Sequence, residues 1–408
     1  MSHRFGDWQP AAVPPNSAAM SASAPVAPPW HIRVQRVLLR FIGLLIIRTV
    51  YRVRTVNADR IPAKGGVLLL PNHVTFTDAF FITAACPRPV RFVMDDRPLE
   101  YAAVRWFCSV FNTVNIRKGQ SREALRLTVD AVNQGDVVCY FAEGQLARTG
   151  ALNELKRGIE LISGKLEAPL VPLWIDGAWG SVFSFERNVF FRKKPYQLPH
   201  RQFAAFGEPI APADGTVEII RDRLLKASAD AVRLRFPEGT PSEINGHQIG
   251  QVNALPWRKP FAVLKGEEVA SSLTEGFSEE FGSLAVTRES IGGPVTSWVG
   301  GNFTRSRIEA SEISAPIDFY DFGSNALEPL TRENVRHFPC LAIDGLVISM
   351  SMPDRGGQPG SRTGSWGLLL PGWFVDGNLV KGPAAENGIP LPAGTSVDAG
   401  GFVVTESA

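Results

Sequence analysis

Apolar runs and amphipathic stretches alternate along the chain between about residues 60 and 210. Val67–Leu70, Val137–Phe141 and the run around Val171 are continuously apolar, which predicts buried strands. A helical pattern follows at residues 77–85, and another begins near Lys156. Because strands and helices take turns, we expect an α/β domain with a sheet flanked by helices.

The flanks of this block have a different composition. Residues 1–29 are rich in Pro, Ala and Ser, which predicts a disordered lead-in without the apolar core of a signal peptide. Residues 241–408 are rich in Gly, Pro, Ser and Trp and contain short strand-like runs. They predict a smaller, β-rich or mixed C-terminal domain beside a main domain of residues 30–240.

Residues 30–55 combine a short apolar run with charges of one sign. The uninterrupted apolar run is Phe41–Ile47, far below the roughly 20 residues that a spanning helix needs. We therefore predict a helix lying in a membrane interface, with its arginines toward anionic headgroups. A basic helix packed on the protein's own core is the alternative, but it leaves the one-signed charge unexplained. The charges are Arg33, Arg36, Arg40, Arg48, Arg52 and Arg54.

Overall composition excludes several classes of protein. A net charge of +2 over 408 residues gives no reason to expect a nucleic-acid partner. The four cysteines form no CxxC pair, which argues against a zinc cluster or a disulfide scaffold and favours a reducing, cytosolic setting. The six histidines form no HExxH motif, so we expect neither a metal ion nor another cofactor.

The segment PNHVTFTDAF, residues 71–80, carries the first candidate chemistry. His73 follows a predicted strand, and Asp78 lies near the start of a predicted helix. Open α/β sheets bind their ligands at that edge. A carboxylate about one turn away can bond one imidazole nitrogen and leave the other free to take a proton. The alternative is a loop histidine beside a helix-capping aspartate.

Further charged residues follow other predicted strands. Arg117 and Lys118 end a short strand at Val114–Ile116, where a solvated turn is the alternative. Glu143 comes directly after a very apolar strand, an unfavourable place for a charge without a partner or a function. Arg148 lies five residues further on.

Together these blocks resemble the glycerolipid acyltransferase family, which includes the lysophosphatidic acid acyltransferases. The order is NHxxxxD, a strand ending in Arg, FxEG with a later Arg, and VP, over about residues 35–235. The matching positions are Asn72, His73 and Asp78, then Arg117, then Phe141, Glu143 and Gly144, and finally Val171 and Pro172.

The resemblance implies transfer of an acyl group from an acyl thioester, acyl-CoA or acyl carrier protein, to the free hydroxyl of a lysophospholipid. The enzyme would act in phospholipid biosynthesis or remodelling, as a peripheral or monotopic protein on the cytoplasmic face of a membrane. His73 would be the general base and Asp78 its partner. Arg117 and Arg148 would hold the lipid phosphate. The remaining implied substrate-binding residues are Asn72, Glu143 and Gly144.

One block departs from the common FPEGTR form, because here it reads FAEGQLAR, with the arginine displaced to Arg148. This longer spacing is similar to the acyltransferase half of 2-acylglycerophosphoethanolamine acyltransferases. The second FPEGT string, Phe236–Thr240, lacks a preceding buried strand, and we expect no catalytic role for it.

The tail offers a weaker resemblance. Ser351–Trp373 is similar to a fragment of adenylate-forming acyl ligases, but the chain has no phosphate-cradling loop ending in Lys. We therefore expect no ATP-dependent ligase activity. Three interpretations of the tail stay open, namely a degenerate ligase remnant, a carrier or lipid dock, and a scaffold. For the whole chain, the alternative to an enzyme is a catalytically silent lipid-binding or scaffold protein.

Overall fold

The computed structural model describes most of the two folded parts of the chain. The described residues are 38, 41, 45, 51–95, 114–116, 121–179, 181–185, 200–237, 243–244, 247–248, 297–300, 302–310, 317–323, 325–343 and 346–405. The predicted lead-in and the candidate phosphate ligand Arg117 lie outside these residues.

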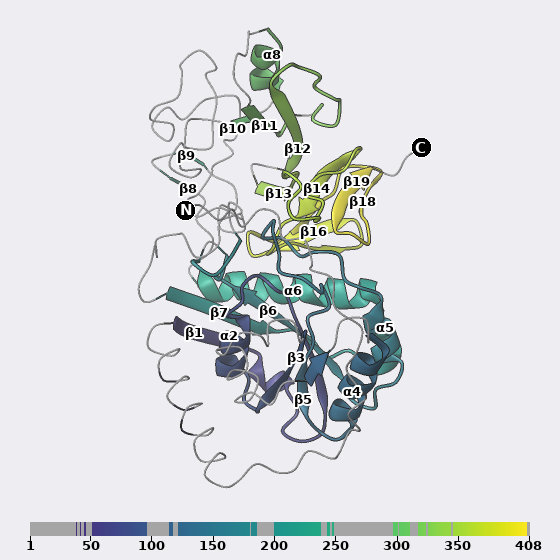
Figure 1. The fold of residues 1–408 in the computed structure, drawn as a ribbon. Coiled ribbons are helices and arrows are strands. Elements are labelled where there is room, and N and C mark those ends of the chain that lie inside the picture. Colours follow the sequence, from purple (N-terminus) through teal and green to yellow (C-terminus); the bar gives the residue numbers. More distant parts are fainter. Residues whose placement is uncertain are drawn as a thin grey trace, which may run out of the picture.

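A mixed seven-stranded sheet forms the centre of the N-terminal part, in the order β1-β7-β6-β2-β5-β3-β4 (Figure 1). Neighbouring strands are parallel except β6 and β7, which are antiparallel. This arrangement confirms the predicted α/β sheet. The strands are β1 (Tyr51–Val56), β2 (Val67–Pro71), β3 (Val90–Asp95), β4 (Val114–Ile116), β5 (Val137–Cys139), β6 (Leu170–Asp176) and β7 (His200–Phe206).

Helices cover both faces of this sheet. Successive residues of β2 alternate between two buried clusters, because side chains of a strand point to opposite faces. On one face Leu69 packs with Phe81 of α2, and on the other Leu68 packs with Leu224 of α6. The helices are α2 (Asp78–Ala85), α4 (Ser121–Asn133), α5 (Gly158–Ser163) and α6 (Val217–Arg235), with short 3-10 turns η1 (Ala58–Arg60) and η4 (Pro212–Asp214).

The helix predicted over residues 30–55 is wrong at its end, since Tyr51–Val56 form strand β1. Parallel pairing with β7 supplies hydrogen bonds that a local pattern cannot reveal. Leu38, Phe41 and Leu45 are helical, and they are 55%, 64% and 55% exposed. Within the described ranges, no helix combines the length and the apolarity needed to cross a bilayer.

The C-terminal region, residues 297–405, is β-rich, which confirms the expectation for the tail. Its larger sheet has seven strands in the order β10-β11-β12-β13-β14-β19-β18, and a smaller one has the order β15-β16-β17. Strands β8 (Glu243–Ile244) and β9 (His247–Gln248) precede it. The other elements are β10 (Ser297–Gly300), α8 (Asn302–Ala310), β11 (Ile317–Asp321), β12 (Val335–Ile343), β13 (Leu346–Met350), β14 (Ser365–Leu369), β15 (Phe374–Asp376), β16 (Leu379–Gly382), β17 (Ala385–Pro390), β18 (Thr395–Val397) and β19 (Phe402–Thr405).

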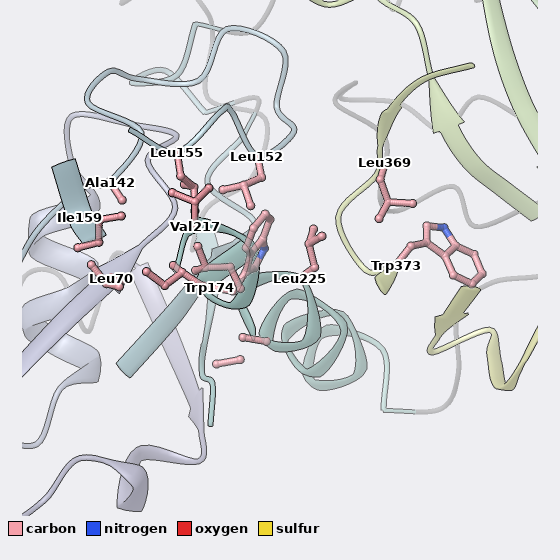
Figure 2. Packing of buried hydrophobic residues seen from close by; sticks show 14 of the residues in the cluster. Leu70, Ala142, Leu152, Leu155, Ile159, Trp174, Val217, Leu225, Leu369 and Trp373 are labelled. Atoms are coloured by element: carbon pink, nitrogen blue, oxygen red, sulfur yellow. The ribbon is translucent and has the colours of Figure 1, made fainter. Parts of the chain in front are cut away.

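Helix α6 joins the two parts of the molecule through one continuous apolar cluster. Figure 2 shows Leu225 of α6 between Trp174 of the N-terminal sheet and Trp373 of the C-terminal region. Trp373 is fully buried, and the N–H of Gly372 donates to the hydroxyl of Ser228 on α6 at 2.8 Å. Removing a buried Trp side chain typically costs about 3–5 kcal/mol, so this joint contributes substantially to stability.

Candidate active site

His73 and Asp78 form a hydrogen-bonded pair where β2 leads into α2. His73 Nδ1 lies 3.0 Å from Asp78 Oδ2, and Asp78 is the first residue of α2 and fully buried. Oδ2 also accepts the N–H groups of Val74 at 2.8 Å and Thr75 at 3.0 Å, while Oδ1 accepts the Thr75 hydroxyl at 2.5 Å. These donors and the helix amino terminus stabilise a carboxylate anion in one orientation.

Further contacts fix the ring face and the carbonyl group of His73. Its ring stacks on Phe141 with centroids 3.8 Å apart, and its carbonyl accepts the N–H of Ala147 at 2.7 Å. A carboxylate at Nδ1 favours the tautomer that carries the proton there, which leaves the lone pair on Nε2. The His73 side chain is 20% exposed, so the ring is partly accessible to solvent.

Glu143 is buried and directs both oxygens toward the chain's own N–H groups. Oε1 accepts the backbone N–H of His73 at 2.6 Å, and Oε2 accepts the backbone N–H and side-chain amide of Asn153 at 3.0 and 2.6 Å. Burial raises the pKa of Glu143 to about 7, although the hydrogen bonds from Asn153 and His73 lower it. The nearby charge of Arg221 interacts with Glu143 across Asn153, whose carbonyl accepts from Arg221 Nη2 at 2.9 Å.

Arg148 stacks on an aromatic side chain beside the histidine loop, which is formed by residues 72–77 between β2 and α2. Its guanidinium carbon lies 3.4 Å from the ring centroid of Phe185, and partial burial lowers the pKa of Arg148. Phe185 in turn contacts Phe76 edge to face, with centroids 6.1 Å apart. Phe76 belongs to the histidine loop and is 57% exposed, so an apolar ring lies on the surface close to the candidate base.

Asn72 and Gly144, two further predicted site residues, make hydrogen bonds within the protein. Asn72 is buried, and its amide bonds both ends of Ile175, accepting from the N–H at 2.7 Å and donating to the carbonyl at 3.1 Å. This pair ties the histidine loop to β6. Gly144 has φ +69° in a turn closed by its N–H to the carbonyl of Phe141, a conformation that favours glycine.

Sequence analysis missed several residues that support the pair. Thr75 carries a local signal, because it stands three residues before Asp78 and its hydroxyl reaches that carboxylate. Asn153 and Phe185 carry no such signal. Asn153 acts through Glu143, ten residues earlier, and Phe185 contacts Phe76 from a distant segment. Among the described residues, no group of three or more His, Cys, Asp and Glu side chains is arranged to hold a metal ion.

Comparisons with known proteins point to the same chemistry. Residues 52–176, which include the histidine pair and Glu143, match the family model described as Acyltransferase. Two curated relatives are both named "Probable 1-acyl-sn-glycerol-3-phosphate acyltransferase". Residues 52–176 therefore resemble an acyltransferase domain.

The relatives of this acyltransferase domain come from two Mycoplasma species. The Mycoplasma pneumoniae protein is 28% identical over 181 residues, covering 42% of this chain and 66% of its own length. The Mycoplasma genitalium protein is 28% identical over 174 residues, covering 40% and 63%. The chain thus spans just under two thirds of these relatives. The crystal structure of a 1-acyl-sn-glycerophosphate acyltransferase, PlsC, from Thermotoga maritima aligns over 50% of this chain and 82% of its own with a TM-score of 0.38 and 16% identity.

Proposed function

We propose that the chain transfers a fatty acyl group from an acyl thioester to the free hydroxyl of a lysophospholipid, with His73 as general base. The observation that carries this proposal is the His73–Asp78 pair, 3.0 Å apart, within the acyltransferase domain. A 1-acylglycerol-3-phosphate is the acceptor that the names of the relatives suggest.

The proposed step needs only the residues of this pair and the two substrates. His73 Nε2 removes the hydroxyl proton while the oxygen attacks the thioester carbonyl carbon. The buried Asp78 stabilises the resulting imidazolium through Nδ1. Collapse of the tetrahedral intermediate breaks the C–S bond, and the imidazolium returns the proton to the leaving thiolate. General-base assistance of this kind is typically worth about 10²–10⁴-fold in rate.

Arg148 supports recognition of an anionic acceptor. A guanidinium stacked on Phe185 keeps its in-plane N–H groups directed sideways, in the geometry that binds phosphate oxygens. Arg117, proposed as a second phosphate ligand, lies outside the described residues. Asn72, Glu143 and Gly144 remain proposed as substrate-binding residues.

Exposed apolar side chains support access from a membrane surface. Leu38, Phe41 and Leu45 are spaced by three and four residues, which places them on one face of a helix, and each is more than half exposed. Phe76, in the histidine loop, is similarly exposed. We propose that these side chains enter the lipid interface, so that a lysolipid reaches His73 without leaving the bilayer.

The test is an acyl-transfer assay on purified full-length protein that crosses acyl-CoA and acyl carrier protein donors with several lysophospholipids. His73→Ala should abolish product formation. The matched control is His337→Ala, because His337 and Asp321 form a second pair with the same 3.0 Å nitrogen–oxygen distance in the C-terminal region. Product formation that survives His73→Ala would favour a catalytically silent, lipid-binding protein whose apparent turnover comes from a contaminant.

A further inference from the structure

The loop between β5 and α5 separates the histidine loop from the C-terminal region. Residues 140–157 contain neither helix nor strand. On one side this loop supports His73, because Glu143 accepts the N–H of His73 and Ala147 donates its N–H to the His73 carbonyl at 2.7 Å. A loop without regular hydrogen bonding of its own depends on other contacts for its position.

Gln358 of the C-terminal region supplies such contacts from the other side. Its Oε1 accepts the N–H of Arg148 at 2.7 Å, and its Nε2 donates to the carbonyl of Leu146 at 2.6 Å. One side-chain amide thus satisfies the peptide groups on both sides of Ala147. Gln358 is only 3% exposed, so losing either bond would leave polar groups unsatisfied away from water.

Packing reinforces these hydrogen bonds over the same stretch of loop. Ala151 belongs to a small buried cluster with Met352, Leu368 and Phe402 of the C-terminal region. Gly356 lies against the guanidinium of Arg148, where a Cβ atom would be 3.2 Å from Arg148 Nε. The C-terminal region therefore contacts both the backbone and the side chain of Arg148.

A second connection runs through Arg221 on α6. Gly401 leaves space for this side chain, since a Cβ atom there would lie 2.4 Å from Arg221 Nη1. Arg221 donates to the carbonyl of Asn153, whose N–H groups donate to Glu143, and Glu143 accepts from His73. Two separate chains of contacts thus lead from the C-terminal region to the backbone of His73.

We propose that the C-terminal region completes the active site of the acyltransferase domain, with Gln358 as a positioning residue for the loop that supports His73. Gln358 acts through Leu146, Ala147 and Arg148 and touches no reacting atom. The inference rests on the proposed function, and it assigns a catalytic contribution to the tail. Because a displacement of about 1 Å can cost roughly 100-fold in rate, loosening this loop should lower turnover.

The experiment compares full-length wild type with Gln358→Met, which keeps the side-chain length but neither accepts nor donates a hydrogen bond as an amide does. We expect kcat to fall roughly 10- to 100-fold, with KM for both substrates nearly unchanged. Gln358→Glu retains the acceptor for the Arg148 N–H and loses the donor to the Leu146 carbonyl. Its kcat should therefore lie between those of wild type and Gln358→Met. Hydrogen exchange at the Ala147 and Arg148 amides should accelerate in Gln358→Met.

Ser349→Ala is the matched control, because the buried Ser349 hydroxyl donates to the Trp366 carbonyl within the C-terminal region. It should lower the melting temperature comparably while leaving kcat and loop exchange at wild-type values. Wild-type kcat and loop exchange in Gln358→Met would overturn the inference. Full activity in His73→Ala would instead overturn the proposed function, and amide exchange would still decide the role of Gln358 in ordering the loop.

Discussion

The carboxylate of Glu143 accepts the backbone N–H of His73 at 2.6 Å. Glu143 therefore contacts the candidate base at its main chain and not at its imidazole ring. Glu143 binds the N–H groups of Asn153 with its other oxygen. It thereby connects the histidine loop to the loop that follows β5. This connection makes the ionisation of Glu143 relevant to stability as well as to the site.

Stability should depend on pH through Glu143. Its pKa is raised from 4.5 to about 7, so between these values the folded state binds the proton more tightly than the unfolded state. The contribution of Glu143 is therefore most favourable below pH 4.5 and is lost as the pH rises toward 7, by an amount on the order of 3 kcal/mol. Urea unfolding of wild type and Glu143→Gln at pH 5, 6, 7 and 8 measures this difference.

The stability of wild type relative to Glu143→Gln should fall from pH 5 to pH 7 and level off above it. A constant offset is expected too, because a glutamine side chain offers an N–H group to one of the donors that the carboxylate accepts. That offset does not vary with pH. A difference that stays the same across all four pH values would contradict the raised pKa.

Asp78→Asn should show how much the negative charge of Asp78 contributes to the activity of His73, beyond orienting its ring. The amide keeps the size of the side chain, but it carries no charge and replaces one of the two acceptor oxygens by an NH2 donor. We expect kcat to fall roughly 10²–10⁴-fold. A buried donor that meets the NH2 group in place of an acceptor oxygen should cost about 1–3 kcal/mol of folding stability. Steady-state kinetics and urea unfolding measure the two effects, and undiminished turnover would exclude Asp78 as the partner of the base.

Arg148→Lys should affect acceptor binding more than turnover. Lysine retains the charge but loses the planar fork and the stacking on Phe185. We expect KM for a phosphate-bearing lysolipid to rise roughly tenfold, which corresponds to one charge-assisted hydrogen bond, while KM for the acyl donor changes little. Arg157→Lys, on the residue preceding α5, is the control and should leave both constants unchanged. An equal rise in both Michaelis constants for Arg148→Lys would argue against phosphate recognition.

Gly401→Ala should disturb the joint between α6 and the C-terminal region. The new methyl group would lie 2.4 Å from Arg221 Nη1, and the backbone has φ +87°. Gly394→Ala is a matched control, since Gly394 has φ +69° but no atom within 4 Å of a new Cβ. The control isolates the backbone strain, about 1–2 kcal/mol. Thermal unfolding should show a clearly larger loss for Gly401→Ala, and equal losses would show that Arg221 moves aside freely.

Replacing Leu38, Phe41 and Leu45 together by serine should weaken binding to phospholipid vesicles. Each apolar side chain transferred from water contributes about 1.5–3 kcal/mol, so even partial insertion of all three is a strong attraction. Leu161→Ser on α5 is the control, because Leu161 is 63% exposed and lies on another element. Sedimentation with vesicles containing anionic lipid measures both variants, and unchanged binding of the triple variant would rule out this face as the membrane contact.

The local chemistry of the site followed from sequence because its parts are close together in the chain. His73, Thr75 and Asp78 lie within one short segment after an apolar strand, so a strand, a turn and a helix start suffice to bring them into contact. The apolar runs at β2, β5 and β6 likewise predicted buried strands and hence a layered α/β fold. These features depend on side-chain type and on geometry between residues close together in the chain, both of which can be inferred from the sequence.

Contacts between distant segments required the tertiary structure. The pairing of Tyr51–Val56 with β7 turned the end of a predicted helix into a strand, since its hydrogen-bonding partner lies far along the chain. Gln358 and Leu146 are 212 residues apart, and no periodicity or motif links them. Their contact exists because α6 and its apolar cluster hold the C-terminal region against the acyltransferase domain, and that packing is a property of the whole fold.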